Sequence, residues 1–231
     1  MGLFAAFRRE QSDPDFFYTR LADDSVAQLS QYAGLGGALV LDVGGGPGYF
    51  RDAFTAAGAR YVAVDADLGE LAARGTLVSG QLLGSGLDLP IRSGAVDVCY
   101  SSNVLEHVAA PERLATEMLR VTRPGGIVFL SYTLWWSPWG GHETAPWHYL
   151  GGRYAAQRFA RRTGRRPKND FGVSLFPVTA ARMIAWSQGR VDADVVDVLP
   201  RYHPGWARWV VQVPVLRELV VWNLVLVLRK R

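Results

Sequence analysis

The feature that most restricts the fold of this chain is the segment 39–50, which reads LVLDVGGGPGYF. An apolar run that leads through a glycine turn into a helical pattern is typical of a buried parallel strand followed by a ligand-binding loop. The dinucleotide spacing G-x-G-x-x-G fails because Tyr49 stands where the third glycine is needed, and the G-K-[ST] ending of a P-loop is absent. What remains is the pattern Asp-x-Gly-x-Gly-x-Gly over 42–48.

Around this loop, apolar runs alternate with helical periodicity, which predicts an α/β fold with a doubly wound sheet. With 231 residues, 49% of them hydrophobic, we expect one domain over 1–231. We expect strands at 38–43, 61–65, 81–83, 96–101, 127–132, 193–199 and 219–228, and helices at 12–33, 49–57, from 68, 111–121 and 179–188. The domain then consists of an N-terminal helix at 12–33, a core at 38–132, a cap at 133–176 and a C-terminal part at 177–231.

The cap is predicted from a change in composition after Tyr132. Four of the eight tryptophans fall between Trp135 and Trp147, and seven basic residues but no acid lie between Glu143 and Asp170. The simpler interpretation of this pattern is a solvated basic helix over an aromatic pocket for an acceptor substrate. The alternative is peripheral contact with an anionic membrane. We expect no nucleic-acid partner, because the basic run lacks a recognition module.

We expect a cytoplasmic protein, with peripheral membrane contact left open. The chain has one cysteine, Cys99, which excludes a disulfide framework within the chain and sits in an apolar run. The start of the chain, 1–9, lacks the features of a signal peptide. The longest apolar run, 219–228, is shorter than the roughly 20 residues that span a bilayer as a helix.

Two acids indicate what the glycine loop binds. Asp65, at the end of the second predicted strand, is placed to accept hydrogen bonds from two ribose hydroxyls. Asp42, expected at the lip of the loop, would repel a phosphate but would attract an ammonium or sulfonium group. This favours S-adenosylmethionine over NAD as the ligand, with Asp42, Gly44, Gly46 and Asp65 as its binding residues.

Six sequence blocks resemble the class I S-adenosylmethionine-dependent methyltransferases of the type 11 kind. In order they are LDVGGGPG at 41–48, VD at 64–65, DLP at 88–90, VDV at 96–98, SNVLEHV at 102–108 and LRVTRPGG at 119–126. Together with GGHE at 140–143 and RYHP at 201–204, the chain more narrowly resembles mycobacterial and other actinobacterial methyltransferases. The resemblance implies a Rossmann-like seven-stranded sheet with an inserted cap after the fifth strand.

The resemblance also implies further contacts to the methyl donor and some departures from the family pattern. GSG at 84–86 stands where many relatives carry Gly-Asp-Ala, so Ser85 or backbone groups replace the usual adenine contact. No Asn-Pro-Pro-Tyr block follows the fourth strand, which disfavours methylation of base amines. The implied donor-binding residues are Asp42, Gly44, Gly45, Gly46, Gly48, Asp65, Ala66, Ser85, Gly86, Leu87, Ser102 and Asn103.

Candidate catalytic residues come from the ends of the predicted strands and from the cap. We predict His142 as a general base, Glu143 or His148 as groups that orient the acceptor, and Tyr132 as a further candidate. His107 is interpreted as a helix-capping or core histidine. We predict no metal site, because the spacing of His142, Glu143 and His148 matches no standard metal motif.

The function that follows is O-methylation of a small molecule, lipid or glycolipid in an envelope-related pathway. The alternative is a protein that binds the donor without catalysing transfer and acts as an accessory in envelope biosynthesis. An NAD-linked oxidoreductase is disfavoured because the dinucleotide spacing is absent.

Overall fold

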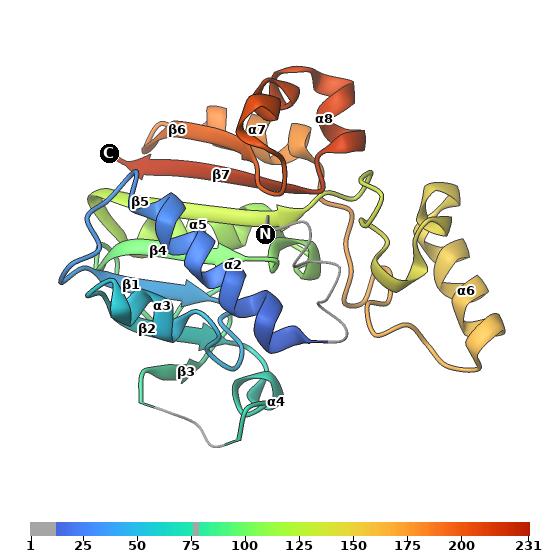
Figure 1. The fold of residues 1–231 in the computed structure, drawn as a ribbon, viewed down its shortest axis with the longest axis horizontal. Helices are drawn as coiled ribbons and strands as arrows, with labels where there is room; N and C mark the ends of the chain where they lie inside the picture. Colours follow the sequence, from blue (N-terminus) through green and yellow to red (C-terminus); the bar gives the residue numbers. More distant parts are fainter. Residues whose placement is uncertain (1–12, 76–78) are drawn as a thin grey trace.

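The structure is a computed structural model that describes residues 13–75 and 79–231. Within these residues, seven strands form one sheet in the order β3-β2-β1-β4-β5-β7-β6 (Figure 1). The strands are β1 Leu39–Val43, β2 Arg60–Asp65, β3 Gln81–Leu83, β4 Val96–Ser102, β5 Thr122–Thr133, β6 Ala193–Pro200 and β7 Asn223–Lys230. Strands β1 to β5 pair in parallel, whereas β7 runs antiparallel to both β5 and β6. The predicted fold class, a doubly wound seven-stranded sheet, is therefore confirmed.

Helices cover both faces of this sheet. The side chains of α2 and α3 pack in one core, and those of α5, α7 and η4 pack in the other. In Figure 1, α2 crosses in front of the strands and α5 lies behind them. The α-helices are α2 Pro14–Leu29, α3 Arg51–Ala56, α4 Leu68–Leu71, α5 Pro111–Val121, α6 Gly152–Thr163, α7 Ala180–Gln188 and α8 Pro214–Val220, and the 3₁₀ helices are η1 Leu105–His107, η2 His142–Thr144, η3 Trp147–Leu150 and η4 Gly205–Gln212.

The central strands are apolar throughout because neighbouring side chains enter opposite cores. In β1, Val40 packs on the side of α2 and α3, and Leu41 packs on the side of α5. In β7, the same alternation holds from Leu224 to Leu228. A strand buried on both faces carries no polar face, which is why these segments read as continuous hydrophobic runs.

Three predicted boundaries are wrong by four residues or more, each for a local reason. The last strand begins at Asn223 rather than 219, because Pro214 opens α8 and this helix takes residues up to Val220. Strand β5 begins at Thr122 rather than 127, since Thr122 pairs with Val96 ahead of the apolar run. Helix α2 ends at Leu29 rather than 33, and Asp13 caps its start by accepting a hydrogen bond from the Phe16 N–H. Residues 1–12, with the predicted start of this helix and the 1–9 segment, lie outside the described residues.

The segment 133–176 follows β5 and contains η2, η3 and α6. Helix α6 stands apart from the sheet at one side of the molecule (Figure 1). Backbone hydrogen bonds fasten the segment to the core: Leu134 donates to the Trp222 carbonyl at 3.0 Å, Trp135 to the Val178 carbonyl at 2.9 Å, and Phe176 to the Glu106 carbonyl at 2.8 Å. We call this segment the cap, and it lies where β5 ends. No helix among the described residues has both the length and the apolar character needed to span a bilayer.

Candidate active site

The glycine loop after β1 is shaped by backbone conformations that side chains disfavour. Gly44, Gly46 and Gly48 have φ angles of 76°, 47° and 82°, in the left-handed region that glycine adopts without strain. A Cβ on Gly44 would lie 2.4 Å from a methyl group of Val104, so the loop packs directly against the chain that follows β4. Beside Gly46 no atom of the described residues 13–75 and 79–231 lies within 4 Å of where a Cβ would be, so these residues leave space over the loop.

Asp65 ends β2 and fixes this loop from the side. One carboxylate oxygen accepts from the Gly46 N–H at 3.0 Å, and the other accepts from the Asp67 N–H at 3.0 Å. Each carboxylate oxygen offers two acceptor sites, so both retain capacity for a second donor. The side chain is half-buried, and its neighbour Ala66 is exposed. Asp65 therefore holds the loop and still has acceptor sites for ribose hydroxyls.

Asp42 lies beneath the loop rather than at its lip. Its side chain is 1% exposed, accepts a hydrogen bond from the Tyr61 hydroxyl at 2.5 Å, and touches the position of a Cβ on Gly45. The pKa of Asp42 is raised to about 7, chiefly by burial; the Tyr61 hydrogen bond lowers it and the charge of Asp65 raises it. A buried carboxyl group whose charged neighbour is another acid favours a ligand that brings positive charge. The chemistry of this site thus fits the predicted sulfonium donor.

The remaining predicted donor contacts fall into two groups. Ser85, Gly86 and Leu87 follow β3, where the exposed Ser85 accepts from the Leu87 N–H at 3.1 Å and Gly86 packs close to Leu114 and Val43. Ser102 and Asn103 end β4 and follow it, and their side chains are engaged by groups from the second half of the chain.

These groups are Arg201 and Asn223, which sequence reasoning did not assign to the site. Arg201 donates to the Ser102 hydroxyl at 2.9 Å and to the Ser131 hydroxyl at 2.8 Å, and Asn223 donates to Asn103 at 2.7 Å. The Arg201 side chain is 0% exposed, and it also pairs with Asp24 of α2 at 3.3 Å. This buried network joins α2, β4, β5 and β7 at the carboxyl edge of the parallel strands. Ser102 and Asn103 are held in place by it.

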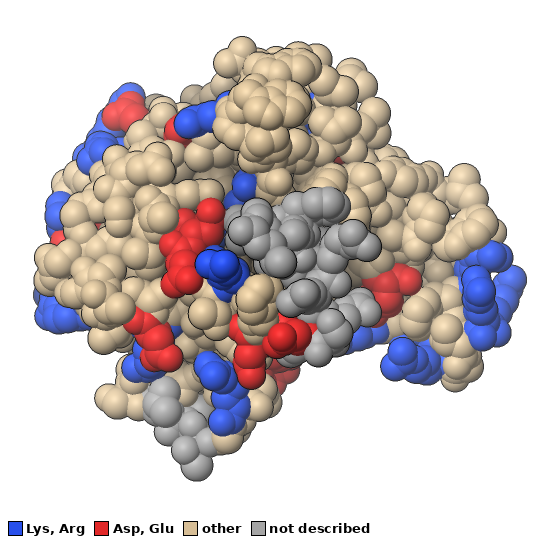
Figure 2. Space-filling model, in the orientation of Figure 1, with Lys and Arg blue, Asp and Glu red and all other residues tan. Residues whose placement is uncertain are grey.

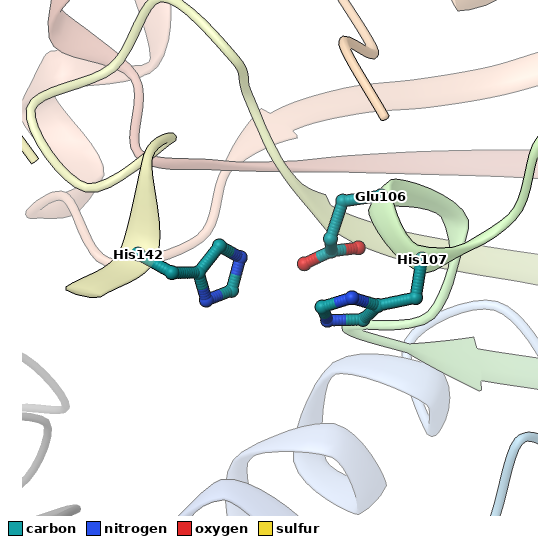
Figure 3. Close-up of side chains that lie close together, drawn as sticks. All are labelled: Glu106, His107 and His142. Atoms are coloured by element: carbon teal, nitrogen blue, oxygen red, sulfur yellow. The ribbon is translucent and has the colours of Figure 1, made fainter. Parts of the chain in front are cut away.

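A second cluster combines η1 with the cap. Glu106, His107 and His142 each offer a donor atom within 4.8 Å of the others, and Figure 3 shows the three side chains pointing toward one another. Glu106 is buried, and one of its oxygens accepts from the Thr133 N–H at 3.0 Å. The other, Oε2, has no hydrogen-bond partner in the part of the chain that the structure describes. Nε2 of His142 is also buried without a partner. Burial lowers the pKa of His142, although the charge of Glu106 acts in the opposite direction.

Of the four predicted catalytic residues, the structure brings His142 to this cluster and gives the others different surroundings. Glu143 accepts two hydrogen bonds from Asn169, at 2.9 and 2.8 Å, and so joins η2 to the later part of the cap. His148 is fully buried, packs edge-on against Trp135, and has Nε2 3.1 Å from the Ser137 carbonyl. Tyr132 is buried in the core shared with α5 and α7.

Sequence reasoning did not assign Glu106 to the site and interpreted His107 as structural. His107 does contact the cap, since its Nδ1 lies 2.7 Å from the Ser174 carbonyl. Their position in the sequence could have indicated a role in the site. Glu106 and His107 lie in the turn that follows the parallel strand β4, at the edge where α/β sheets bind ligands. The partner His142 lies in the cap, and no local pattern joins the two segments.

The glycine loop and this cluster are neighbours through Val104. Its side chain packs on Gly44, and η1 begins at the next residue. Glu106 and His107 therefore follow within three residues of the side chain that packs on the glycine loop.

The site does not coincide with a hollow that the surface of the molecule carries elsewhere. A hollow of about 520 Å³ lies at the opposite edge of the sheet, lined in part by Ala38 and Asp97. The Asp97 carboxylate is already satisfied there, by the Leu39 N–H at 2.7 Å and by Arg123 at 2.6 Å. The Asp97 carboxylate is therefore not available to a ligand in this hollow, whereas unpartnered side-chain atoms of the Glu106, His107 and His142 cluster lie at the carboxyl edge.

The outer surface of the cap is aromatic and basic. Trp136, Trp147, Tyr149, Leu150 and Tyr154 are all exposed. The guanidinium of Arg158 lies 3.8 Å from the centre of the Trp147 ring. Lys and Arg side chains gather over α6 in Figure 2.

Comparison with known proteins gives a consistent result. A family profile described as a methyltransferase domain matches residues 41–130. A protein of Mycolicibacterium vanbaalenii named an uncharacterized methyltransferase is 52% identical, with 98% of this chain and 92% of that protein covered. A Mycobacterium marinum protein of the same name is 48% identical over 99% of this chain and 93% of its own length. Among solved structures, an S-adenosylmethionine-dependent methyltransferase from Mesorhizobium loti has a TM-score of 0.60 at 20% identity, covering 88% of this chain and 96% of that one.

Proposed function

The chain belongs to a family of methyltransferases, and from this premise we propose that it takes a methyl group from S-adenosylmethionine and transfers it to a hydroxyl oxygen of an amphipathic acceptor. The acceptor class is a lipid or glycolipid of an envelope-related pathway. The donor site of the proposal consists of the glycine loop with Asp42 and Asp65, and the acceptor site lies between the loop and the cap.

One observation carries the choice of oxygen. The cluster of Glu106, His107 and His142 presents a buried imidazole nitrogen and a buried carboxylate oxygen, neither of them hydrogen-bonded, one turn of chain from the glycine loop. A hydroxyl group must lose its proton as it attacks, whereas an amine that is already neutral needs no base. A basic cluster beside the donor loop therefore favours a hydroxyl acceptor.

Bound S-adenosylmethionine supplies a methyl group on a positively charged sulfur. The methyl–sulfur bond breaks as the methyl–oxygen bond forms, and the hydroxyl proton passes to the cluster, where Nε2 of His142 is the proposed acceptor. Asp65 and the loop position the donor, and the cap holds the acceptor and excludes water. Most of the rate enhancement in such a displacement comes from alignment.

The surface of the cap supports an acceptor with an apolar part. Exposed aromatic side chains next to a basic helix match a membrane interface, where aromatic rings sit at the headgroup level and arginines pair with anionic lipids. We further propose that the cap contacts an anionic membrane and takes the acceptor from it. The occurrence of similar proteins in mycobacteria is consistent with an envelope lipid.

The test of the function combines donor binding with a transfer assay. Purified protein is titrated with S-adenosylhomocysteine and, separately, with NADH, and is then incubated with methyl-labelled donor and envelope lipid extract. We expect micromolar binding of S-adenosylhomocysteine, no binding of NADH, and label in a base-stable lipid ether. Binding without transfer to any extract would contradict the enzymatic proposal and favour the donor-binding accessory, and label in an amine would contradict the choice of oxygen.

Membrane contact is tested separately by sedimentation with vesicles. We expect binding to vesicles that contain anionic lipid, a loss with neutral vesicles, and a reduction when Arg161 and Arg162 are both changed to glutamine. Equal sedimentation with both kinds of vesicle, or none with either, would contradict the membrane part of the proposal.

A further inference from the structure

We propose that Glu106, His107 and His142 form a binding site for one divalent transition metal ion, with Zn²⁺ as the best fit. Two imidazole nitrogens and one carboxylate oxygen are a ligand set found in catalytic zinc sites. The sequence predicted no metal, from the spacing of His142, Glu143 and His148. The three residues that meet in space include two from η1, far from the cap in sequence.

The side chains are already gathered for this role. Their donor atoms lie within 4.8 Å of one another, and they converge from η1 on one side and from η2 on the other (Figure 3). Ligand atoms bound at about 2.0–2.1 Å in a tetrahedral arrangement lie roughly 3.4 Å apart. The side chains therefore need to close by about 1.4 Å at the widest separation, which small rotations of three side chains supply.

The unsatisfied atoms point to a ligand in the cluster. Glu106 is 2% exposed, and its Oε2 has no hydrogen-bond partner among the described residues. Nε2 of His142 is also buried, and it too has no partner among these residues. Buried polar atoms are nearly always paired with protein, water or an ion. Both atoms belong to the same cluster of side chains, so a single bound ion would satisfy them together.

Hydrogen bonds with neighbouring backbone groups orient His107 and Glu106 in the way that metal ligands are commonly oriented. A carbonyl oxygen accepts hydrogen bonds but does not donate them, so the 2.7 Å contact to the Ser174 carbonyl places the proton of His107 on Nδ1. This leaves the lone pair of Nε2 for the ion. The Thr133 N–H fixes the other oxygen of Glu106. Metal-binding histidines and carboxylates are commonly held in this way.

Three protein ligands leave a coordination position open, as in catalytic rather than structural zinc sites. Here the inference rests on the proposed function: an acceptor hydroxyl at that position would be acidified by the ion and would release its proton to water as it binds the ion, before the methyl transfer. In the metal-bound protein the imidazole of His142 is therefore a ligand, and the role of proton acceptor proposed for its Nε2 applies to the metal-free protein. Binding of the ion itself does not depend on the methyl-transfer reaction.

The experiment uses untagged full-length protein stripped with a chelator and dialysed. It is titrated with Zn²⁺ by calorimetry and with Co²⁺ by visible absorption, and bound metal is counted by mass spectrometry. We expect one equivalent of metal and the absorption of Co²⁺ bound by nitrogen and oxygen ligands. Glu106→Gln, His107→Ala and His142→Ala are each expected to weaken binding at least tenfold, whereas His203→Gln, which removes a histidine outside the cluster, is expected to bind as the wild type does.

The outcomes separate this proposal from the function. Less than a tenth of an equivalent after dialysis, or binding that none of the three substitutions weakens, would overturn the metal site even if methyl transfer continues. One equivalent that is lost in the three variants would support the site even if no methyl acceptor is found. Circular dichroism of each variant identifies a loss of binding that arises from misfolding, and the conservative Glu106→Gln variant provides a test that retains the shape of the side chain.

Discussion

The donor-binding core and the cap are built in different ways. In the core, Asp65 and the glycines form a loop through backbone groups, at the end of strands that are buried on both faces. In the cap, short helices are fastened by a few specific contacts, such as those between Glu143 and Asn169, and their aromatic side chains remain exposed. The comparison teaches that the proposed donor site is shaped by local backbone geometry, whereas the proposed acceptor site is shaped by contacts between distant segments.

The first prediction is that a change in the cap lowers turnover and leaves donor affinity unchanged. In His142→Ala, turnover is expected to fall by about 10²–10⁴, the contribution typical of a general base, because the variant lacks the unpartnered nitrogen of the cluster. The affinity for S-adenosylhomocysteine is expected to stay within twofold. Single-turnover kinetics and calorimetry measure the two effects, with His203→Gln as the control. Near-normal turnover would remove His142 from the reaction.

The second prediction is the converse change in the core. Asp65→Ala removes the acceptor of the Gly46 and Asp67 N–H groups together with the acceptors proposed for the ribose. Hydrogen bonds to charged groups contribute about 1.5–3 kcal/mol each, so donor affinity is expected to fall roughly 100-fold. Asp67→Asn, which changes the cap of α4, is the matched control. Unchanged affinity in Asp65→Ala would exclude Asp65 from the donor site.

The third prediction concerns pH. Because the donor-free pKa of Asp42 is raised to about 7, this carboxyl group is mostly protonated at pH 6 and mostly ionised at pH 8. An ionised Asp42 attracts the positive charge of the donor, so affinity is expected to rise about tenfold from pH 6 to pH 8, following the ionised fraction. The rise should disappear in Asp42→Asn. Parallel profiles for the two proteins would show that Asp42 does not act on the charge of the donor.

The smallest effect is expected where the cap is fastened to itself. Asn169→Ala removes the hydrogen bond that the Asn169 side chain donates to the half-buried Glu143 and keeps the one from its backbone N–H, so it should cost about 1–2 kcal/mol of stability. Turnover is expected to fall a few-fold because η2 carries His142, while donor affinity stays unchanged. Thermal unfolding and steady-state kinetics measure this, with Thr163→Ala at the exposed end of α6 as the control. A loss of donor affinity as large as the loss of turnover would contradict the separation between cap and core.

Much of the core was predictable because its elements follow from local patterns. Helix α5 begins and ends at the residues that Pro111 and the apolar periodicity indicate, and β3 matches its predicted range. Boundaries failed where another element competed for the same residues, as α8 did for the start of β7. The position of Asp42 beneath the loop was also not predicted, because alternation along a strand does not say how deeply a strand end is covered.

The sequence by itself determined the fold and the shape of the glycine loop, and it predicted the kind of ligand, because the glycine spacing, Asp42 and Asp65 lie in one turn and at two adjacent strand ends. The tertiary structure decided which groups surround the acceptor site. Glu106 and His107 meet His142, and Arg201 meets Ser102, only after the sheet has formed and the cap has folded over its edge. The physical reason is the range of the interactions. Hydrogen bonds and steric contacts within a turn depend on neighbouring residues, whereas contacts between distant segments depend on how the whole chain packs.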